Sequence, residues 1–75
     1  MKEEEIVEAL KRENQEFKKL SEEHRNLDHL IVEIDKRVYL TTEEEIERKK
    51  IQKLKLAKKD RMAVLIREYK KGLIH

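Results

Sequence analysis

The chain has 75 residues, a formal net charge of +2, 48% charged and 37% hydrophobic side chains, one Gly, and neither Pro nor Cys. This length allows one domain with a small core, which disfavours a deep active-site cleft, and the lack of Cys excludes disulfides and thiolate metal sites. No stretch has the apolar character of a signal peptide or a transmembrane helix, so we expect a cytoplasmic protein with no membrane contact.

The first predicted helix covers about residues 3–38. Its apolar residues recur in alternating steps of three and four, which is the pattern of a coiled-coil seam. The expected seam residues of this helix are Leu10, Phe17, Leu20, Leu27, Ile31 and Ile34. Two seam positions are polar, Glu13 and His24, and no residue within this helix is expected to break it.

A turn over about residues 39–42 is predicted to separate this helix from the next one. Either Thr41 or Thr42 can cap the new helix, with Glu44 or Glu45 three residues later completing a capping box. The alternative is one continuous helix through the turn in an extended dimer, since neither Pro nor Gly interrupts the segment.

The second predicted helix covers about residues 43–71, and Gly72 after it is expected to take the left-handed cap conformation. Its apolar residues lie within one arc at about 100° per residue. The expected seam residues are Ile51, Leu54, Met62, Leu65 and Tyr69. Lys58 lies in the middle of this arc and is the polar residue of the seam.

The short turn predicts that the two helices run antiparallel as neighbours. Residues whose numbers add up to about 82 then face each other, which places His24 level with Lys58 and Glu13 level with Tyr69. The charges agree, because residues 1–45 carry 8 basic and 14 acidic side chains and residues 46–75 carry 11 basic and 3 acidic ones. We therefore predict an all-α, single-domain, two-helix antiparallel coiled-coil hairpin.

Two segments resemble a small bacterial coiled-coil family typified by YdcH. They are Phe17-Lys-Lys-Leu-Ser-Glu-Glu-His-Arg-Asn-Leu-Asp28 and Lys55-Leu56-Ala-Lys-Lys59-Asp60-Arg-Met62. The resemblance covers roughly residues 15–66, and one departure is Lys58, where this family more often has Leu. It implies a helical hairpin of unassigned function and no catalytic residue.

His24 and Asp28 lie one helical turn apart, a spacing that can supply two ligands to a metal ion. A metal site needs further ligands, so we predict no metal and no cofactor, and we expect His24 to fix the helix register. No Gly-rich loop, Ser-His-Asp arrangement or nucleotide-binding motif occurs in the sequence. We therefore predict no enzyme activity and no small-molecule substrate.

A second, weaker apolar stripe is expected outside the seam. Its residues are Val7, Leu30, Leu56, Val64 and Ile66. Two hairpins packed through these stripes would form a homodimeric four-helix bundle, and a helix of another protein is the alternative occupant. We therefore predict a non-catalytic module for protein interaction or self-association.

The alternative function is nucleic-acid binding without sequence preference. The second helix carries a basic run of Arg48, Lys49, Lys50, Lys53, Lys55, Lys58, Lys59 and Arg61. Such a run can bind phosphates with a strong salt dependence. Its residues are spread around the helix and lack interleaved aromatic side chains, so we expect helix association to be the function.

Overall fold

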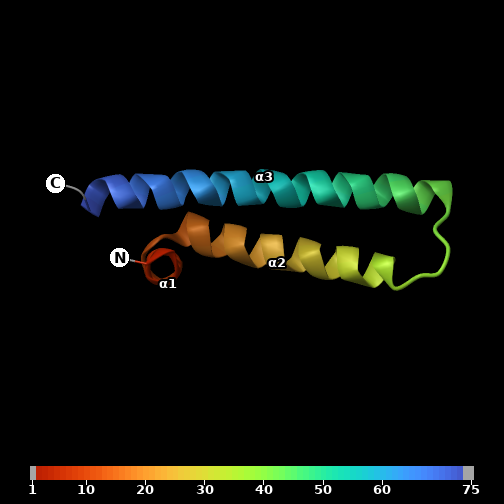
Figure 1. The fold of residues 1–75 in the computed structure, drawn as a ribbon, viewed down its shortest axis with the longest axis horizontal. Helices are drawn as coiled ribbons and strands as arrows, with labels where there is room; N and C mark the ends of the chain where they lie inside the picture. Colours follow the sequence, from red (N-terminus) through yellow and green to blue (C-terminus); the bar gives the residue numbers. More distant parts are fainter. Residues whose placement is uncertain (1, 74–75) are drawn as a thin grey trace.

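The structure, a computed structural model, describes residues 2–73 of the chain. Within that range it contains three helices and no strand: α1 (Glu3–Glu13), α2 (Gln15–Asp35) and α3 (Thr42–Leu73). The predicted all-α class is confirmed, whereas the prediction of two helices is wrong, because the first predicted helix is divided at Asn14. α2 and α3 lie side by side and antiparallel along a molecule of 53 × 20 × 15 Å (Figure 1).

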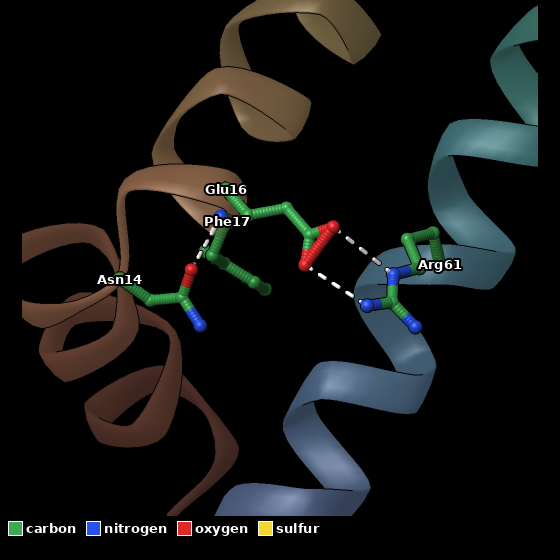
Figure 2. A network of polar contacts seen from close by, with 4 residues as sticks. All are labelled: Asn14, Glu16, Phe17 and Arg61. Carbon is green, nitrogen blue, oxygen red and sulfur yellow. Dashed lines mark hydrogen bonds and ion pairs between the residues drawn. The ribbon is translucent and has the colours of Figure 1, made fainter.

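Asn14 ends α1 and starts α2. Its backbone is extended, with φ of −121° and ψ of 110°, and its Oδ1 accepts a hydrogen bond of 3.0 Å from the backbone N–H of Phe17 (Figure 2). The first N–H groups of a helix have no backbone partner, and an Asn side chain at this position satisfies one of them. As a result, α1 does not continue the line of α2 and is seen end-on beside its first turn (Figure 1).

α1 packs at the end of the molecule where α2 begins and α3 ends (Figure 1). The buried cluster at this end consists of Ile6 and Leu10 from α1, Phe17 and Leu20 from α2, and Leu65 from α3. Phe17 is 0% exposed. Since full burial of one large apolar side chain contributes about 1.5–3 kcal/mol, this cluster holds all three helices together.

The loop between α2 and α3 is longer than the predicted turn. α2 ends at Asp35, before the predicted residue 38, and residues 36–41 connect it to α3. Val38 and Tyr39 are both 88% exposed. Most helical stability in proteins comes from packing, and α3 begins only at Thr42, so a helix at these residues would bury no apolar surface against it.

α3 begins with a capping box. Thr41 Oγ1 accepts a hydrogen bond from the N–H of Glu44, and Glu44 Oε1 accepts one from the N–H of Thr41, both at 3.1 Å. Of the pairs that the sequence allowed, the structure selects Thr41 with Glu44. This interruption also excludes one continuous helix through residues 39–42.

At its other end α3 continues through Gly72 to Leu73. Among the described residues no Gly has a positive φ, so the expected left-handed cap at Gly72 is wrong. A Cβ placed on Gly72 would meet no atom within 4 Å. A side chain at this position would therefore meet no steric conflict.

Candidate interaction surface

The residues predicted for the helix seam differ in their exposure. Leu10, Phe17, Leu20, Ile31, Ile51 and Leu65 are buried, and Leu27, Ile34, Met62 and Tyr69 are partly buried. Leu54 is 53% exposed, which contradicts its predicted place in the seam. The next residue, Lys55, faces α2 instead, and adjacent residues on a helix point about 100° apart.

Ion pairs connect α2 to α3 along their contact. They join Asp28 to Lys55 at 2.6 Å, Glu23 to Lys58 at 3.0 Å and Asp35 to Arg48 at 2.7 Å. The two residue numbers in each pair add up to 81 or 83. These pairs therefore follow the register of about 82 that a short antiparallel connection predicts.

Further ion pairs lie at the two ends of the hairpin. Arg37 in the loop pairs with Glu44 in the first turn of α3. Near Asn14, the guanidinium of Arg61 donates to both carboxylate oxygens of Glu16, at 3.0 and 3.3 Å (Figure 2). The acidic first half and the basic second half of the sequence thus compensate each other within one chain.

These contacts change the titration of the groups involved. The hydrogen bond from Lys55, together with its charge, lowers the pKa of Asp28 below its usual value of 3.8. Arg48 lowers the pKa of Asp35 in the same way, and Asp35 raises the pKa of Arg48. Hydrogen bonding to the charged form is the largest cause in each case, so the ionised forms of these side chains are the stable ones in the folded chain.

The three polar seam residues have different surroundings. Lys58 forms an ion pair with Glu23, the residue before His24, which agrees with the register that places Lys58 level with His24. His24 is partly buried and lines an open groove. Glu13 is exposed, since it is the last residue of α1 and the break at Asn14 takes it out of the line of α2.

The groove is lined by α1 and α3, with His24 contributed by α2, and has a volume of about 480 Å³. Its apolar lining consists of Val7, Leu56, Met62, Ala63 and Ile66, and its polar lining of Glu3, His24, Gln52, Lys55 and Lys59. Leu56 is 46% exposed, although it is one of the large apolar residues of the lining. We refer to this feature as the apolar groove.

The predicted second stripe is divided by the structure. Val7, Leu56 and Ile66 line the apolar groove. Leu30 is 50% exposed and lines a separate depression on α2, beside His29. Val64 is partly buried but lies outside the groove, because two steps along a helix turn a side chain by about 200° from Ile66.

Two further features of residues 2–73 concern metal binding and membrane insertion. In this part of the chain no three His, Cys, Asp or Glu side chains are grouped closely enough to hold a metal ion. None of its helices is both long and apolar enough to cross a membrane.

The chain matches the model of one known protein family. The family model of a protein of unknown function, DUF465, matches residues 17–66. The chain belongs to the DUF465 family. This confirms the resemblance found in the sequence over roughly residues 15–66, and no curated protein and no solved structure matches the chain.

The DUF465 match begins at Phe17 and therefore covers most of α2, the loop and most of α3, while α1 lies outside it. Sequence reasoning missed the residue that separates these parts, Asn14. The signal was the residue type itself, because Asn is among the preferred N-cap residues and is unfavourable within a helix. It also missed the contributions of Glu3 and Ala63 to the groove, which depend on where α1 packs.

Proposed function

We propose that this DUF465 protein is a non-catalytic module that acts by packing its helices against another helical protein or a second copy of itself. The observation that supports this most directly is the apolar groove. It gathers five apolar residues on an open surface shared by α1 and α3.

Covering the apolar groove with a partner is expected to lower the free energy. Each Å² of apolar surface removed from water contributes about 25 cal/mol. The chain buries few large side chains within itself, and small scaffolds without disulfides or metals usually gain further stability by association. A helix laid along Leu56, Met62 and Ile66 would cover apolar side chains that the single chain leaves open.

The test compares two Leu residues of similar exposure. Leu56→Asp places a charge in the apolar groove, whereas Leu30→Asp places the same charge on α2 outside it. We expect Leu56→Asp to weaken association at least about tenfold, because an unpaired charge is costly to bury, and Leu30→Asp to leave it near wild type. Circular dichroism would check that both variants remain helical.

Association is measured in two ways, by sedimentation equilibrium of the pure protein and by affinity capture from cells with quantitative mass spectrometry. Either self-association or a captured partner must be present in the wild type and in Leu30→Asp and be lost in Leu56→Asp. The proposal fails if no association of either kind depends on Leu56.

Nucleic-acid binding is the second candidate function. One observation favours it: Lys49 and Lys53 are exposed on α3 and have no ion-pair partner within residues 2–73. Four other residues of the basic run are less available, because Arg48, Lys55, Lys58 and Arg61 pair with acidic residues of α2. A salt-sensitive complex with short duplex DNA, lost when Lys49, Lys53 and Lys59 are all changed to Ala, would favour this function instead.

A further inference from the structure

We propose that Val38, Tyr39 and Leu40, in the loop between α2 and α3, form a second interaction surface that inserts into an apolar pocket with a basic rim on a partner protein. We refer to these three residues as the loop tip. It lies at the end of the molecule opposite to α1 (Figure 1). The inference goes beyond the proposed function, because the loop tip does not line the apolar groove.

The loop tip exposes two adjacent large apolar side chains. Val38 and Tyr39 are each 88% exposed, whereas the other exposed large apolar side chains of residues 2–73 range from 46% to 53%. Leu40, which follows them, is partly buried. Single apolar residues are common on protein surfaces, but adjacent ones at this exposure favour a contact with another molecule.

Apolar exposure continues from the loop tip onto the two helices that it joins. Val32, in the last turn of α2, is 48% exposed, and Ile46, near the start of α3, is 49% exposed. Both residues belong to the same end of the hairpin as the loop tip. A partner that covers this end can therefore bury more apolar surface than the loop tip alone provides.

Glu44 holds the two ends of the loop. Its Oε1 accepts a hydrogen bond of 3.1 Å from the N–H of Thr41, and its carboxylate also pairs with Arg37. Thr41 Oγ1 accepts in return from the N–H of Glu44. Residues 38–40 therefore connect two anchored residues, and a surface that is shaped before binding loses less conformational entropy on association.

The charged side chains beside the loop tip leave carboxylates available to a partner. The basic residues of the loop are both engaged, since Lys36 donates to Glu33 at 3.0 Å and Arg37 belongs to the ion pair described above. In contrast, Glu43 and Glu45, in the first turn of α3, are exposed and have no ion-pair partner within residues 2–73. The free charge beside the loop tip is therefore negative.

An apolar surface beside free carboxylates fits an apolar pocket with a basic rim. Complementary charges speed association and exclude wrong partners, and Tyr is among the residues that most often contribute strongly to binding at protein interfaces. Phosphates of a nucleic acid or of an anionic membrane would be repelled by the carboxylates of Glu43 and Glu45. The charges thus favour a protein as the partner.

Photocrosslinking in cells that naturally produce the protein identifies the partner. Tyr39 is replaced by the photoreactive residue p-benzoylphenylalanine, and Leu54, at 53% exposure on α3, is replaced in the same way as the matched control. We expect a discrete protein adduct from position 39 that is absent from position 54. The crosslinked peptide of the partner should be apolar and lie close to Lys or Arg residues.

Affinity for the purified partner tests the chemistry of the contact. Tyr39→Ser should weaken binding at least about tenfold, and Leu54→Ser should leave it within about twofold of wild type. The double variant with Glu43→Lys and Glu45→Lys should weaken binding about tenfold at low salt and less at high salt, because salt screens exposed charges. Isothermal titration calorimetry measures all three variants.

Stability measurements separate binding from folding. Carboxylates in the first turn also stabilise a helix, so circular dichroism must show that the variant with both Glu changes remains helical. The urea midpoint of Tyr39→Ser should equal that of wild type, because the side chain is 88% exposed. A clearly lower midpoint would show that Tyr39 serves the fold, and the inference would then be wrong.

Vesicles test the membrane as an alternative. The wild-type chain is mixed with vesicles of phosphatidylcholine alone and of phosphatidylcholine with phosphatidylglycerol, and we expect it to bind neither. Binding to either vesicle that is lost in Tyr39→Ser would overturn the protein pocket. So would the absence of an adduct at position 39, an equal adduct at position 54, or an acidic crosslinked peptide.

The loop tip and the apolar groove fail on different variants. Leu56→Asp should leave the affinity of the loop-tip partner within about twofold of wild type, because Leu56 lines the groove and not the loop. If this affinity is lost in Leu56→Asp and kept in Tyr39→Ser, the partner binds the groove. That result would support the proposed function and overturn the loop tip.

Discussion

At the scale of single residues, Asn14 has the largest effect on the path of the chain. Its side chain replaces the hydrogen bond that a continuous helix would have supplied to the N–H of Phe17. Because Phe17 is fully buried, the exact start of α2 also decides where the largest core side chain lies. One polar side chain thus links local backbone geometry to the packing of three helices.

Replacing Asn14 should therefore cost stability. We expect Asn14→Ala to lower the free energy of unfolding by about 1 kcal/mol, the usual cost of removing an N-cap side chain. Asn14→Asp is the matched control and should stay near wild type, since a carboxylate also accepts from the N–H of Phe17. Urea unfolding followed by circular dichroism measures both, and equal stability of Asn14→Ala and wild type would show that the cap contributes nothing.

The apolar pattern could not reveal the break at Asn14. Ile6 and Leu10 keep the spacing of a seam, although in the structure they reach the cluster around Phe17 from a helix that has turned. Burial of apolar residues was therefore predictable from spacing, whereas the direction of α1 was not. That direction depends on one side-chain hydrogen bond, whose strength is too small to appear in a periodic pattern.

The acidic residues of the ion pairs predict how stability responds to pH. The pKa values of Asp28 and Asp35 are lowered in the folded chain, so both carboxylates favour folding above their usual value of 3.8, and this contribution is lost as pH falls below it. We expect Lys55→Met to reduce the loss of stability between pH 7 and pH 3. Lys50→Met, at an exposed position, is the control, and urea unfolding at both pH values is the measurement.

A pH response of Lys55→Met equal to that of Lys50→Met would contradict the link between Asp28 and Lys55. Asp35 should still respond in both variants, because its partner Arg48 is unchanged. The expected result is thus a partial and not a complete loss of the acid dependence.

At the scale of elements, α1 acts as a clamp on the open end of the hairpin. Ile6 is 1% exposed and contacts the cluster formed by all three helices. We expect Ile6→Ala to lower the free energy of unfolding by about 2–5 kcal/mol and to destabilise α2 and α3 together with α1. Glu8→Gly, at an exposed position of α1, gives a comparison that mainly weakens the helix propensity of α1, by up to about 1 kcal/mol.

Hydrogen exchange of backbone amides shows which helices Ile6→Ala destabilises. Faster exchange in α2 and α3 as well as α1 would agree with a clamp. Faster exchange confined to residues 3–13 would show that the hairpin is stable without it, and the role of α1 in the core would then be wrong.

The ends of the elements show which parts of the fold follow from local sequence. The start of α3 was predictable because the capping box of Thr41 and Glu44 is a contact between near neighbours. The end of α2 was not, since Val38 continues the apolar spacing although nothing packs against it. The prediction that Leu54 lies in the seam was wrong because Lys55, and not Leu54, contacts α2 through Asp28. Leu54 is therefore exposed to solvent.

At the scale of the whole molecule, charged side chains occur in two places, the contact between α2 and α3 and the apolar groove. Pairs such as Glu23 with Lys58 hold α2 to α3 and fix their register. Lys59 and Glu3 line the apolar groove, outside that contact. The opposite charges of the two halves predicted the ion pairs between α2 and α3. The charged residues of the groove could not be predicted without knowing where α1 packs.

The loop of residues 36–41 has a consequence for how the chain folds. The pair of Arg37 with Glu44 closes only a short loop, so its entropic cost is small, and each later pair along the hairpin extends a contact already made. Folding is then expected to start beside the capping box and to proceed away from it. The contacts of α1 with α3, which join the most distant segments of the chain, form last, so the groove and its binding capacity exist only once folding is complete.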